Sequence, residues 1–282
     1  MKSKSNLIQT RAIIILRKAL AVMKKEFITM ISYKLNFLFK LSSIWLSLLV
    51  YYFLSKLIDP AVSTQLQPYG GNYFSFVLIG TAFSSYLNVG LDGFSSSIRN
   101  AQLTGTLEAV LVTRTRFTTI LIFQTLWNFL FASIHVIAYL IFGFAFFESD
   151  LGNPDYFAAI VMLLLTILAF SSLGILSGSF ILVFKKGTPV NWLFYHLSRF
   201  LGGVFYPITV LPEWCQKLAQ LLPITHSLRG IRLALLQGYS LSQLHTEVYS
   251  LIVFIVILLP VSIICFNLAF RQTRKDGTLC HY

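Results

Sequence analysis

Long stretches of apolar residues alternate along the chain with short segments that contain charged residues, prolines and glycines. A helix that crosses a lipid bilayer needs about 20 mostly apolar residues. About six stretches meet this requirement, so the pattern predicts an all-α membrane protein with six transmembrane helices. The predicted spans are residues 35–58, 72–91, 117–147, 156–184, 192–210 and 247–270.

The residues before the first span predict a helix with one apolar face and one basic face. Successive residues advance about 100° around a helix axis, which places Leu20 and Phe27 on one side and Arg17 and Lys24 on the other. Such a helix lies flat on a membrane surface, with its lysines toward acidic headgroups. We expect it either to orient the first span or to transmit movement from a cytoplasmic partner.

The segment between the second and third spans predicts a short helix outside the membrane. Asp92 ends the apolar run of the second span. Gly105, followed three residues later by Glu108, is typical of a helix N-terminus. A helix over about 106–113 has an apolar face formed by Leu107, Val110 and Leu111. This face needs a groove on another protein, or it packs against the chain's own N-terminal helix.

The chain between the fifth and sixth spans reads FYPITVLPEWCQKLAQLLPITHSLRGIRLALLQG. We expect a half-helix to end near Pro207, because proline cannot continue the hydrogen-bond ladder. Apolar spacing after Pro212 predicts a short helix that Pro223 ends, and a second short helix running to Gly238. Irregular backbone at membrane depth must be buried in protein or line a wet cavity. We therefore expect residues 207–238 to dip into the outer leaflet.

Composition supports a membrane protein. The 282-residue chain is 56% hydrophobic and only 11% charged, whereas soluble domains carry about a quarter charged residues. No A-x-A cleavage site follows the first span, so we expect that span to stay as an anchor.

The net charge of +12 is distributed unevenly between the loops. Lys and Arg lie before the first span, in the second and fourth interspan loops and after the last span, whereas Asp and Glu occupy the alternate loops. Basic loops stay in the cytoplasm. Both termini are therefore expected inside, and this alternation with the spans favours a membrane role over nucleic-acid binding.

A few ionisable residues interrupt the spans or break the charge bias. Lys40 lies near an end of the first span and can extend to the headgroups. A lone membrane histidine such as His135 is typical of a hydrogen bond between helices, and Arg199 is expected to face a protein interior or a partner. Arg229 and Arg232 lie on the external side, where they either have a functional role or extend to lipid phosphate.

Signatures of enzymes do not occur in the sequence. It has no H-E-x-x-H, no G-x-S-x-G and no acidic cluster within a span, so we expect no catalytic residues and no metal site. Without a Gly-Lys dipeptide it has no P-loop, so any ATP must be bound by a second polypeptide. The three cysteines predict neither a disulfide framework nor a metal site.

The order of these parts resembles the permease subunit of ABC-2 type exporters. The resemblance rests on GTLEAVLVTR after the second span, on RKDGTL in the tail, and on a run between the last two spans: Tyr206-Pro207, Leu211-Pro212, Leu222-Pro223, Arg232 and Gly238. It implies a homodimer or heterodimer of permeases bound to two cytoplasmic ATPase subunits, which hold ATP and Mg²⁺. Many relatives carry a proline shortly after the coupling helix, where this chain has Thr113-Arg114-Thr115-Arg116.

The resemblance also implies roles for particular segments. Residues 104–112 are the coupling helix that contacts the ATPase, through Gly105, Thr106, Leu107, Glu108, Val110 and Leu111. Residues 207–238 are the external re-entrant gate, which includes Tyr206, Pro207, Pro212, Trp214, Pro223 and Arg232. We expect the substrate path between the two permeases to include Phe83, Tyr86, Tyr195, Arg199 and Phe205.

We therefore expect a cytoplasmic tail with an amphipathic connecting helix over 1–34, a six-helix transmembrane domain over 35–270 and a cytoplasmic tail over 271–282. The expected function is ATP-driven export of an amphipathic drug, lipid or glycolipid across the cytoplasmic membrane. A polysaccharide or lipid-linked glycan is an alternative cargo. A membrane enzyme or channel and a purely structural scaffold are alternative functions.

Overall fold

A computed structural model describes residues 17–28, 32, 34–57, 64–103, 105, 117–147, 152–184 and 188–275. Every regular element in these ranges is a helix, and no strand occurs there. The long helices are α2 (Lys34–Leu57), α4 (Tyr73–Leu103), α6 (Phe117–Phe146), α7 (Tyr156–Phe184) and α11 (His245–Lys275). The short elements are η1 (Gln67–Tyr69), α8 (Thr188–Leu201), η2 (Ile208–Val210), α9 (Glu213–Gln220) and α10 (Pro223–Gln237).

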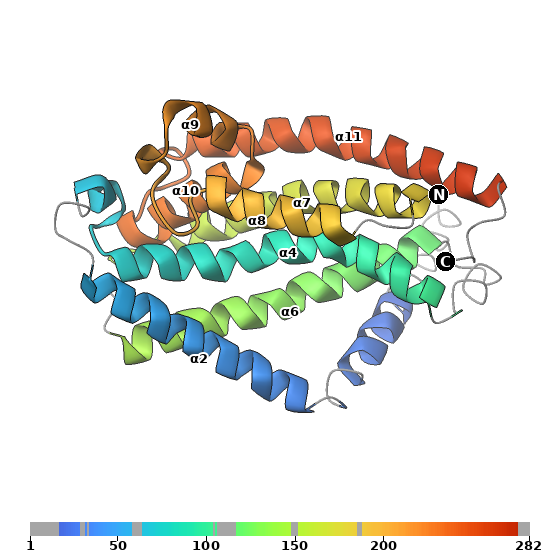
Figure 1. Ribbon diagram of the computed structural model, residues 1–282, viewed down its shortest axis with the longest axis horizontal. Coiled ribbons are helices and arrows are strands. Elements are labelled where there is room, and N and C mark those ends of the chain that lie inside the picture. Colours follow the sequence, from blue (N-terminus) through green and yellow to red (C-terminus); the bar gives the residue numbers. More distant parts are fainter. Residues whose placement is uncertain are drawn as a thin grey trace, which may run out of the picture.

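Helix α4 is the centre of the bundle, with α6, α7 and α8 beside it and α2 crossing at an angle (Figure 1). Within its apolar stretch 83% of residues are buried, against 11–39% in the other candidate spans. The short elements α9 and α10 lie at the same end of the bundle as the first residues of α4, α7 and α11 (Figure 1). The outer helices therefore present apolar side chains outward, as a lipid-exposed bundle requires.

Five helices in the described ranges are long and apolar enough to cross a membrane. They are Leu38–Leu57, Tyr73–Leu103, Thr118–Phe146, Tyr156–Phe184 and His245–Thr273. These correspond to the first, second, third, fourth and sixth predicted spans, and the fourth has the predicted limits. The all-helical membrane architecture is confirmed, whereas a count of six spans stays a prediction.

The fifth predicted span, residues 192–210, differs in the structure. Helix α8 has 14 residues and ends at Leu201, so its length of about 21 Å is less than the bilayer core of about 30 Å. It ends where two glycines follow, and Gly203 has a φ of 73° that other residues rarely adopt. The prediction that this helix ends near Pro207 is therefore wrong, because the glycine pair ends it earlier.

The second span is longer than predicted, because the helix continues past residue 91, where the prediction of 72–91 ended it. Helix α4 continues for 31 residues to Leu103, a length of about 46 Å. The Asp92 carboxylate accepts a hydrogen bond of 3.0 Å from the Asn191 side chain of α8. This bond stabilises one carboxylate oxygen inside the bundle and helps to accommodate the polar residue within a continuous helix.

The N-terminal helical residues 17–28 contact α6 near its start. The Glu26 carboxylate accepts a hydrogen bond of 3.1 Å from Gln124, and the ring of Phe27 lies edge-on to Trp127 with centroids 6.3 Å apart. Leu20 and Phe27, predicted on the apolar side, are exposed. This helix is therefore attached to the bundle while part of its apolar side stays uncovered.

Two short helices occur where proline spacing predicted them. Helix α9 begins directly after Pro212, and α10 begins at Pro223. Gly238, in the left-handed conformation with a φ of 66°, ends α10, and the next amide bonds back to the Leu233 carbonyl. Glu213 and Lys217, four residues apart on α9, have no ion pair in this part of the structure.

Small residues bring α4 and α7 close together. A Cβ atom at Gly174 of α7 would overlap the Gly90 carbonyl oxygen of α4. A Cβ atom at Gly90 would lie 2.6 Å from that of Phe170. Gly178, one turn after Gly174, lies against Phe94. This small-xxx-small arrangement lets the two backbones approach, as is typical of helix pairs in membranes.

Candidate functional site

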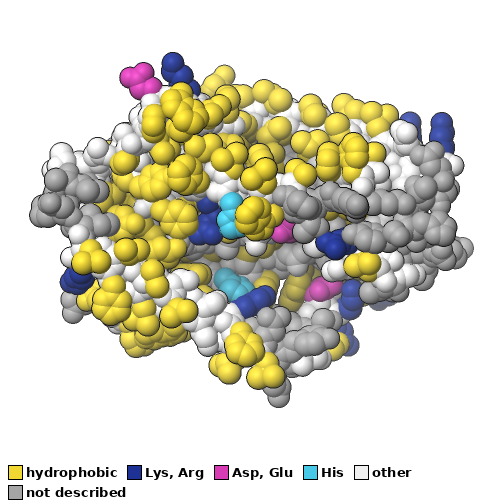
Figure 2. All heavy atoms as spheres, viewed as in Figure 1, with side chains coloured by type: hydrophobic (Ala, Val, Ile, Leu, Met, Phe, Trp, Pro, Cys, Tyr) yellow, Lys and Arg dark blue, Asp and Glu magenta, His cyan; other side chains and the backbone are white. Residues whose placement is uncertain are grey.

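The face that shows α2, α4 and α8 is covered mainly by apolar side chains, but it has a hollow near its centre. Figure 2 shows Lys or Arg, His and Asp or Glu side chains gathered around this hollow. Charged groups at membrane depth are costly and usually face a cavity, a partner or the protein interior. The hollow is therefore the part of this surface that differs most from a lipid-facing one.

A cavity of about 390 Å³ lies between α2, α4 and α6. Lys40 of α2, Asp92 of α4 and His135 of α6 all line it, together with the amides of Asn88 and Asn128. The Lys40 ammonium lies 5.0 Å from the centre of the Phe131 ring. Five polar or charged groups from three helices thus share one concave site, which fits the usual description of a ligand pocket.

Behind this cavity, hydrogen bonds tie α8 to α4 and α7. The Asn191 amide donates to Asp92, at 3.0 Å, and to the Ser95 hydroxyl, also at 3.0 Å. The side-chain oxygen of Asn191 accepts a hydrogen bond of 2.6 Å from the Ser177 hydroxyl of α7. This network fixes the Asp92 carboxylate and the position of α8 relative to α4.

Aromatic rings surround Arg199 near the C-terminal end of α8. Its guanidinium carbon lies 4.8 Å from the Phe205 ring centre and 5.3 Å from that of Tyr195. Phe205 in turn lies 6.2 Å from Tyr51 of α2. Three residues of the predicted substrate path, Tyr195, Arg199 and Phe205, therefore form one half-buried cluster between α8 and α2.

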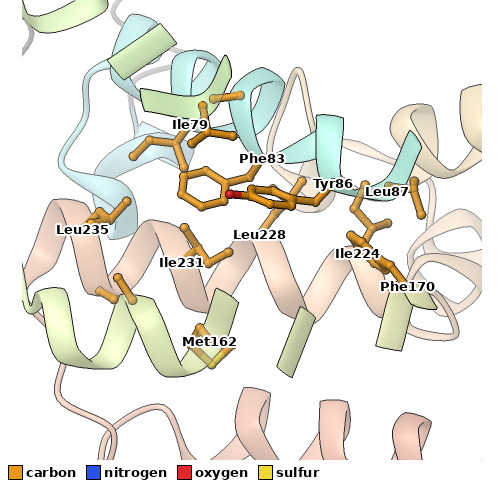
Figure 3. Close-up of a cluster of buried hydrophobic side chains, with 14 of the residues drawn as sticks. Ile79, Phe83, Tyr86, Leu87, Met162, Phe170, Ile224, Leu228, Ile231 and Leu235 are labelled. Carbon is orange, nitrogen blue, oxygen red and sulfur yellow. The ribbon is translucent and has the colours of Figure 1, made fainter. Parts of the chain in front are cut away.

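The other two predicted path residues, Phe83 and Tyr86, lie elsewhere. Both belong to the largest buried core cluster, where their rings face Leu228 and Ile231 of α10 (Figure 3). The Tyr86 hydroxyl donates a hydrogen bond of 2.8 Å to Ser133 of α6. A substrate would reach these two residues only if α4, α6 and α10 moved apart.

Arg232 of α10 is buried, with 3% of its surface exposed. Its guanidinium donates to the backbone carbonyls of Phe76, Gly203 and Val204 at 3.1, 2.7 and 2.9 Å. It also lies over the Phe76 ring, 3.5 Å from the centre. Arg232 therefore joins α10 to α4 and to the turn after α8, and the expectation that it extends to lipid phosphate is wrong. A functional role for Arg232 stays a prediction.

Arg232 keeps its charge in this setting. Burial lowers the pKa of its guanidinium to about 9, which still leaves the group protonated at neutral pH. Gly80 of α4 makes the arrangement possible, because a Cβ atom there would overlap both the Arg232 guanidinium and the Val204 carbonyl oxygen. Glycine is thus the residue that fits where the arginine crosses α4.

Arg229 has a different environment one turn earlier in α10. Its Nε atom lies 3.2 Å from a carboxylate oxygen of Glu247. Most of the Arg229 side chain is exposed, whereas the Glu247 side chain is buried. Both residues line a second cavity, of about 580 Å³, at the end of the bundle that carries α9 and α10. The ion pair therefore joins the short helix to the first turn of α11.

The other predicted gate residues lie around these short helices. The Tyr206 hydroxyl donates a hydrogen bond of 2.8 Å to the Phe200 carbonyl. Pro207 is buried, Pro212 precedes the first residue of α9, and Pro223 is the first residue of α10. Trp214 is 66% exposed, as a side chain that contacts lipid would be.

Most of the predicted coupling helix lies outside the described residues, namely Thr106, Leu107, Glu108, Val110 and Leu111. Gly105 is described: it is exposed, follows α4 and has a φ of 65°. Among the described residues, His135 forms no hydrogen bond with another helix, contrary to the prediction. Its Nδ1 atom lies 3.1 Å from the Phe131 carbonyl of the same helix.

Sequence reasoning did not identify Asp92, Asn191 or Gly80 as site residues. Asp92 and Asn191 are polar residues within long apolar stretches, which is itself a signal. Gly80 gave no separate signal, because glycine is common in membrane helices. Among the described residues, no group of three His, Cys, Asp or Glu side chains is placed to hold a metal ion.

Comparison with known proteins supports a transport role. The family model of the ABC-2 type transporter matches residues 17–236. The inner membrane transport permease YadH of Escherichia coli K12 is 37% identical over 109 residues, and YadH of Shigella flexneri matches equally. The aligned part covers 39% of this chain and 41% of each permease. Because the family model covers most of the chain, from the N-terminal helical residues through α9 and nearly all of α10, this protein belongs to the ABC-2 type transporter family.

Proposed function

We propose that this chain is the membrane subunit of an ATP-driven exporter that moves an amphipathic molecule outward across the cytoplasmic membrane. Drugs, lipids and glycolipids are the cargo class. The observation that carries the proposal is the polar cavity that Lys40, Asp92 and His135 line in an otherwise apolar bundle. Polar groups at membrane depth fit a substrate path better than a lipid-facing surface.

In this proposal, a second permease copy closes the path. Helix α8 has only 14 residues, and Trp192, Leu193 and Phe200 on its outer side are more than half exposed. A second copy packed against this side would cover these residues and enclose the hollow between the two subunits. The partner is either an identical chain or a related permease.

An ABC ATPase is the general partner of a permease of this family. We place two copies on the cytoplasmic side, against the segment 104–112, and ATP and Mg²⁺ would be bound there. Binding of ATP would close the ATPase subunits and move this segment, and the movement would pass along α4, which is continuous up to Leu103. The permease itself carries no step of ATP hydrolysis.

Acidic substitutions on the apolar face of the coupling segment test this partner. Replacing both Leu107 and Leu111 with Asp should abolish substrate-stimulated ATPase activity and release the ATPase, because two charges would enter an apolar groove. The measurement is co-purification of the ATPase with membrane-inserted permease. The matched control is Ala109→Asp with Thr113→Asp, which adds the same charges on the other side of the predicted helix. An ATPase that stays bound at wild-type affinity to the Leu107/Leu111 variant would contradict the coupling role.

A cysteine-labelling experiment tests the orientation. We propose that both termini are cytoplasmic and that residues 207–238 are external. In a Cys215→Ser background, Gln220→Cys should react with an impermeant thiol reagent in intact cells, since Gln220 is exposed on the last turn of α9. Gln272→Cys, exposed near the opposite end of α11, should react only after lysis. The reverse pattern would invert the topology.

A further inference from the structure

The cavity between α2, α4 and α6 contains two opposite charges that do not pair with each other. Lys40 and Asp92 both line it, yet neither forms an ion pair with any described residue. The Lys40 side chain is exposed toward the cavity and contacts the Phe131 ring. Asp92 is half-buried, and one of its carboxylate oxygens accepts a hydrogen bond from Asn191. Each charge therefore has unused capacity to bind a group of opposite sign.

Both charges lie at a similar depth. At about 1.5 Å per residue, Lys40 is about 26 Å along α2 from Leu57, and Asp92 is about 29 Å along α4 from Tyr73. Leu57 and Tyr73 lie at the same end of the bundle (Figure 1). The hydrocarbon core of a bilayer is about 30 Å thick. In the proposed orientation, the two charges therefore lie within the membrane, in the half nearer the inner leaflet.

The size and lining of the cavity also fit a headgroup. Its 390 Å³ corresponds to about a dozen water molecules, which is enough for a small polar group and too little for a lipid with its chains. Asn88, Asn128 and Ser85 add hydrogen-bonding groups to the lining. Apolar chains attached to such a headgroup could stay outside, where Phe39 and Leu46 of α2 are more than 60% exposed.

We propose that this cavity binds the headgroup of a zwitterionic phospholipid, with its phosphate toward Lys40 and its ammonium toward Asp92. A purely anionic headgroup would leave Asp92 without a cation and place negative charge near it. A purely cationic amphiphile would leave Lys40 without an anion and place positive charge near it. The inference deepens the proposed export function, since it names the class of substrate that would enter from the inner leaflet.

Binding of short-chain lipids to the full-length purified chain in neutral detergent tests this proposal. We expect dihexanoyl phosphatidylethanolamine to bind saturably in calorimetric titration, and dihexanoyl phosphatidic acid to bind at least tenfold more weakly. Asp92→Asn keeps the acceptor for Asn191 but removes the charge, so it should abolish this preference. Lys40→Met should weaken binding of both lipids about tenfold. Lys56→Met, on the same helix beside Tyr52, is the matched control and should change neither affinity.

Several outcomes would overturn the proposal. They are tighter binding of phosphatidic acid, no saturable binding of either lipid, and unchanged binding in both the Lys40 and Asp92 variants. O-phosphoethanolamine, which has no acyl chains, is tested in the same way. If it binds as tightly as the lipid, the ligand of this cavity is a free phosphoamine and not a lipid headgroup. An unchanged melting temperature of each variant shows that a loss of binding does not come from unfolding.

The test is separable from the test of the export function. Lipid binding is measured without the ATPase, so it can succeed when ATPase coupling through Leu107 and Leu111 fails. Conversely, a permease that couples to its ATPase but shows no headgroup preference would refute the lipid site alone. The Leu107/Leu111 variant itself should bind dihexanoyl phosphatidylethanolamine with wild-type affinity.

Discussion

Arg232→Met is expected to destabilise the bundle by about 3–5 kcal/mol, more than any other single charge removal in the cap formed by α9 and α10. The guanidinium donates to three carbonyls from two separate parts of the chain. Gly203 and Val204 follow the last turn of α8, so no N–H group of that helix can donate to their carbonyl oxygens. Methionine fills a similar volume but leaves these buried acceptors without donors.

The measurement is the apparent melting temperature of purified protein, which should fall on the order of 10 °C. Arg232→Lys should fall between wild type and Arg232→Met, because an ammonium keeps the charge but lacks the planar fork that reaches several carbonyls. Lys217→Met removes an exposed cation from the neighbouring helix α9 and should leave the melting temperature unchanged. Equal melting of Arg232→Met and wild type would show that the three bonds contribute nothing to stability.

Gly80→Ala gives an independent check on the same arrangement. Its Cβ atom would overlap the Arg232 guanidinium and the Val204 carbonyl, so the alanine should disturb the same bonds. Residues that share an interaction show non-additive effects. We therefore expect Gly80→Ala combined with Arg232→Met to cost less than the two single changes added together, and strict additivity would contradict the shared site.

Local sequence information was sufficient for most of the bundle. The span over 156–184 was predicted to the residue, because a long uninterrupted apolar run bounded by polar residues leaves little choice in a membrane. Pro212 and Pro223 likewise indicated that two separate short helices occur here, since proline cannot continue a helix and is favoured where one begins. Such signals depend on chain neighbours alone.

The differences arise where distant residues meet or where composition is ambiguous. Asp92 ends an apolar run in the sequence, and its hydrogen bond to Asn191, far away in sequence, could not be predicted from neighbouring residues. Arg232 breaks the charge bias in the sequence, and only the fold brings the Phe76 and Val204 carbonyls within hydrogen-bond distance of its guanidinium. The run after Leu201 is apolar enough to be a helix, and only the glycine pair indicates that the chain turns there. The coupling role of residues 104–112 stays a prediction.

Gly174→Leu is expected to be the most disruptive change at a helix contact, with a loss of at least about 3 kcal/mol. The obstacle at Gly174 is the backbone carbonyl of Gly90, and a backbone held in a continuous helix cannot rotate away as a side chain can. Helices α4 and α7 would have to separate. Their separation would open the core around Phe170 and Leu91, both of which are buried.

The neighbouring glycine supplies a graded comparison. A Cβ atom at Gly178 would lie 3.3 Å from the Phe94 Cβ atom and 3.4 Å from the Ile98 Cδ1 atom, so relief needs a shift of only a few tenths of an ångström. Gly174→Ala should therefore lower the melting temperature more than Gly178→Ala does, although both add a single methyl group. Ala145→Leu, on the exposed side of α6, adds bulk toward lipid and should have no effect. If Gly178→Ala proved as costly as Gly174→Ala, contact between the α4 and α7 backbones would not be what limits side-chain size at this crossing.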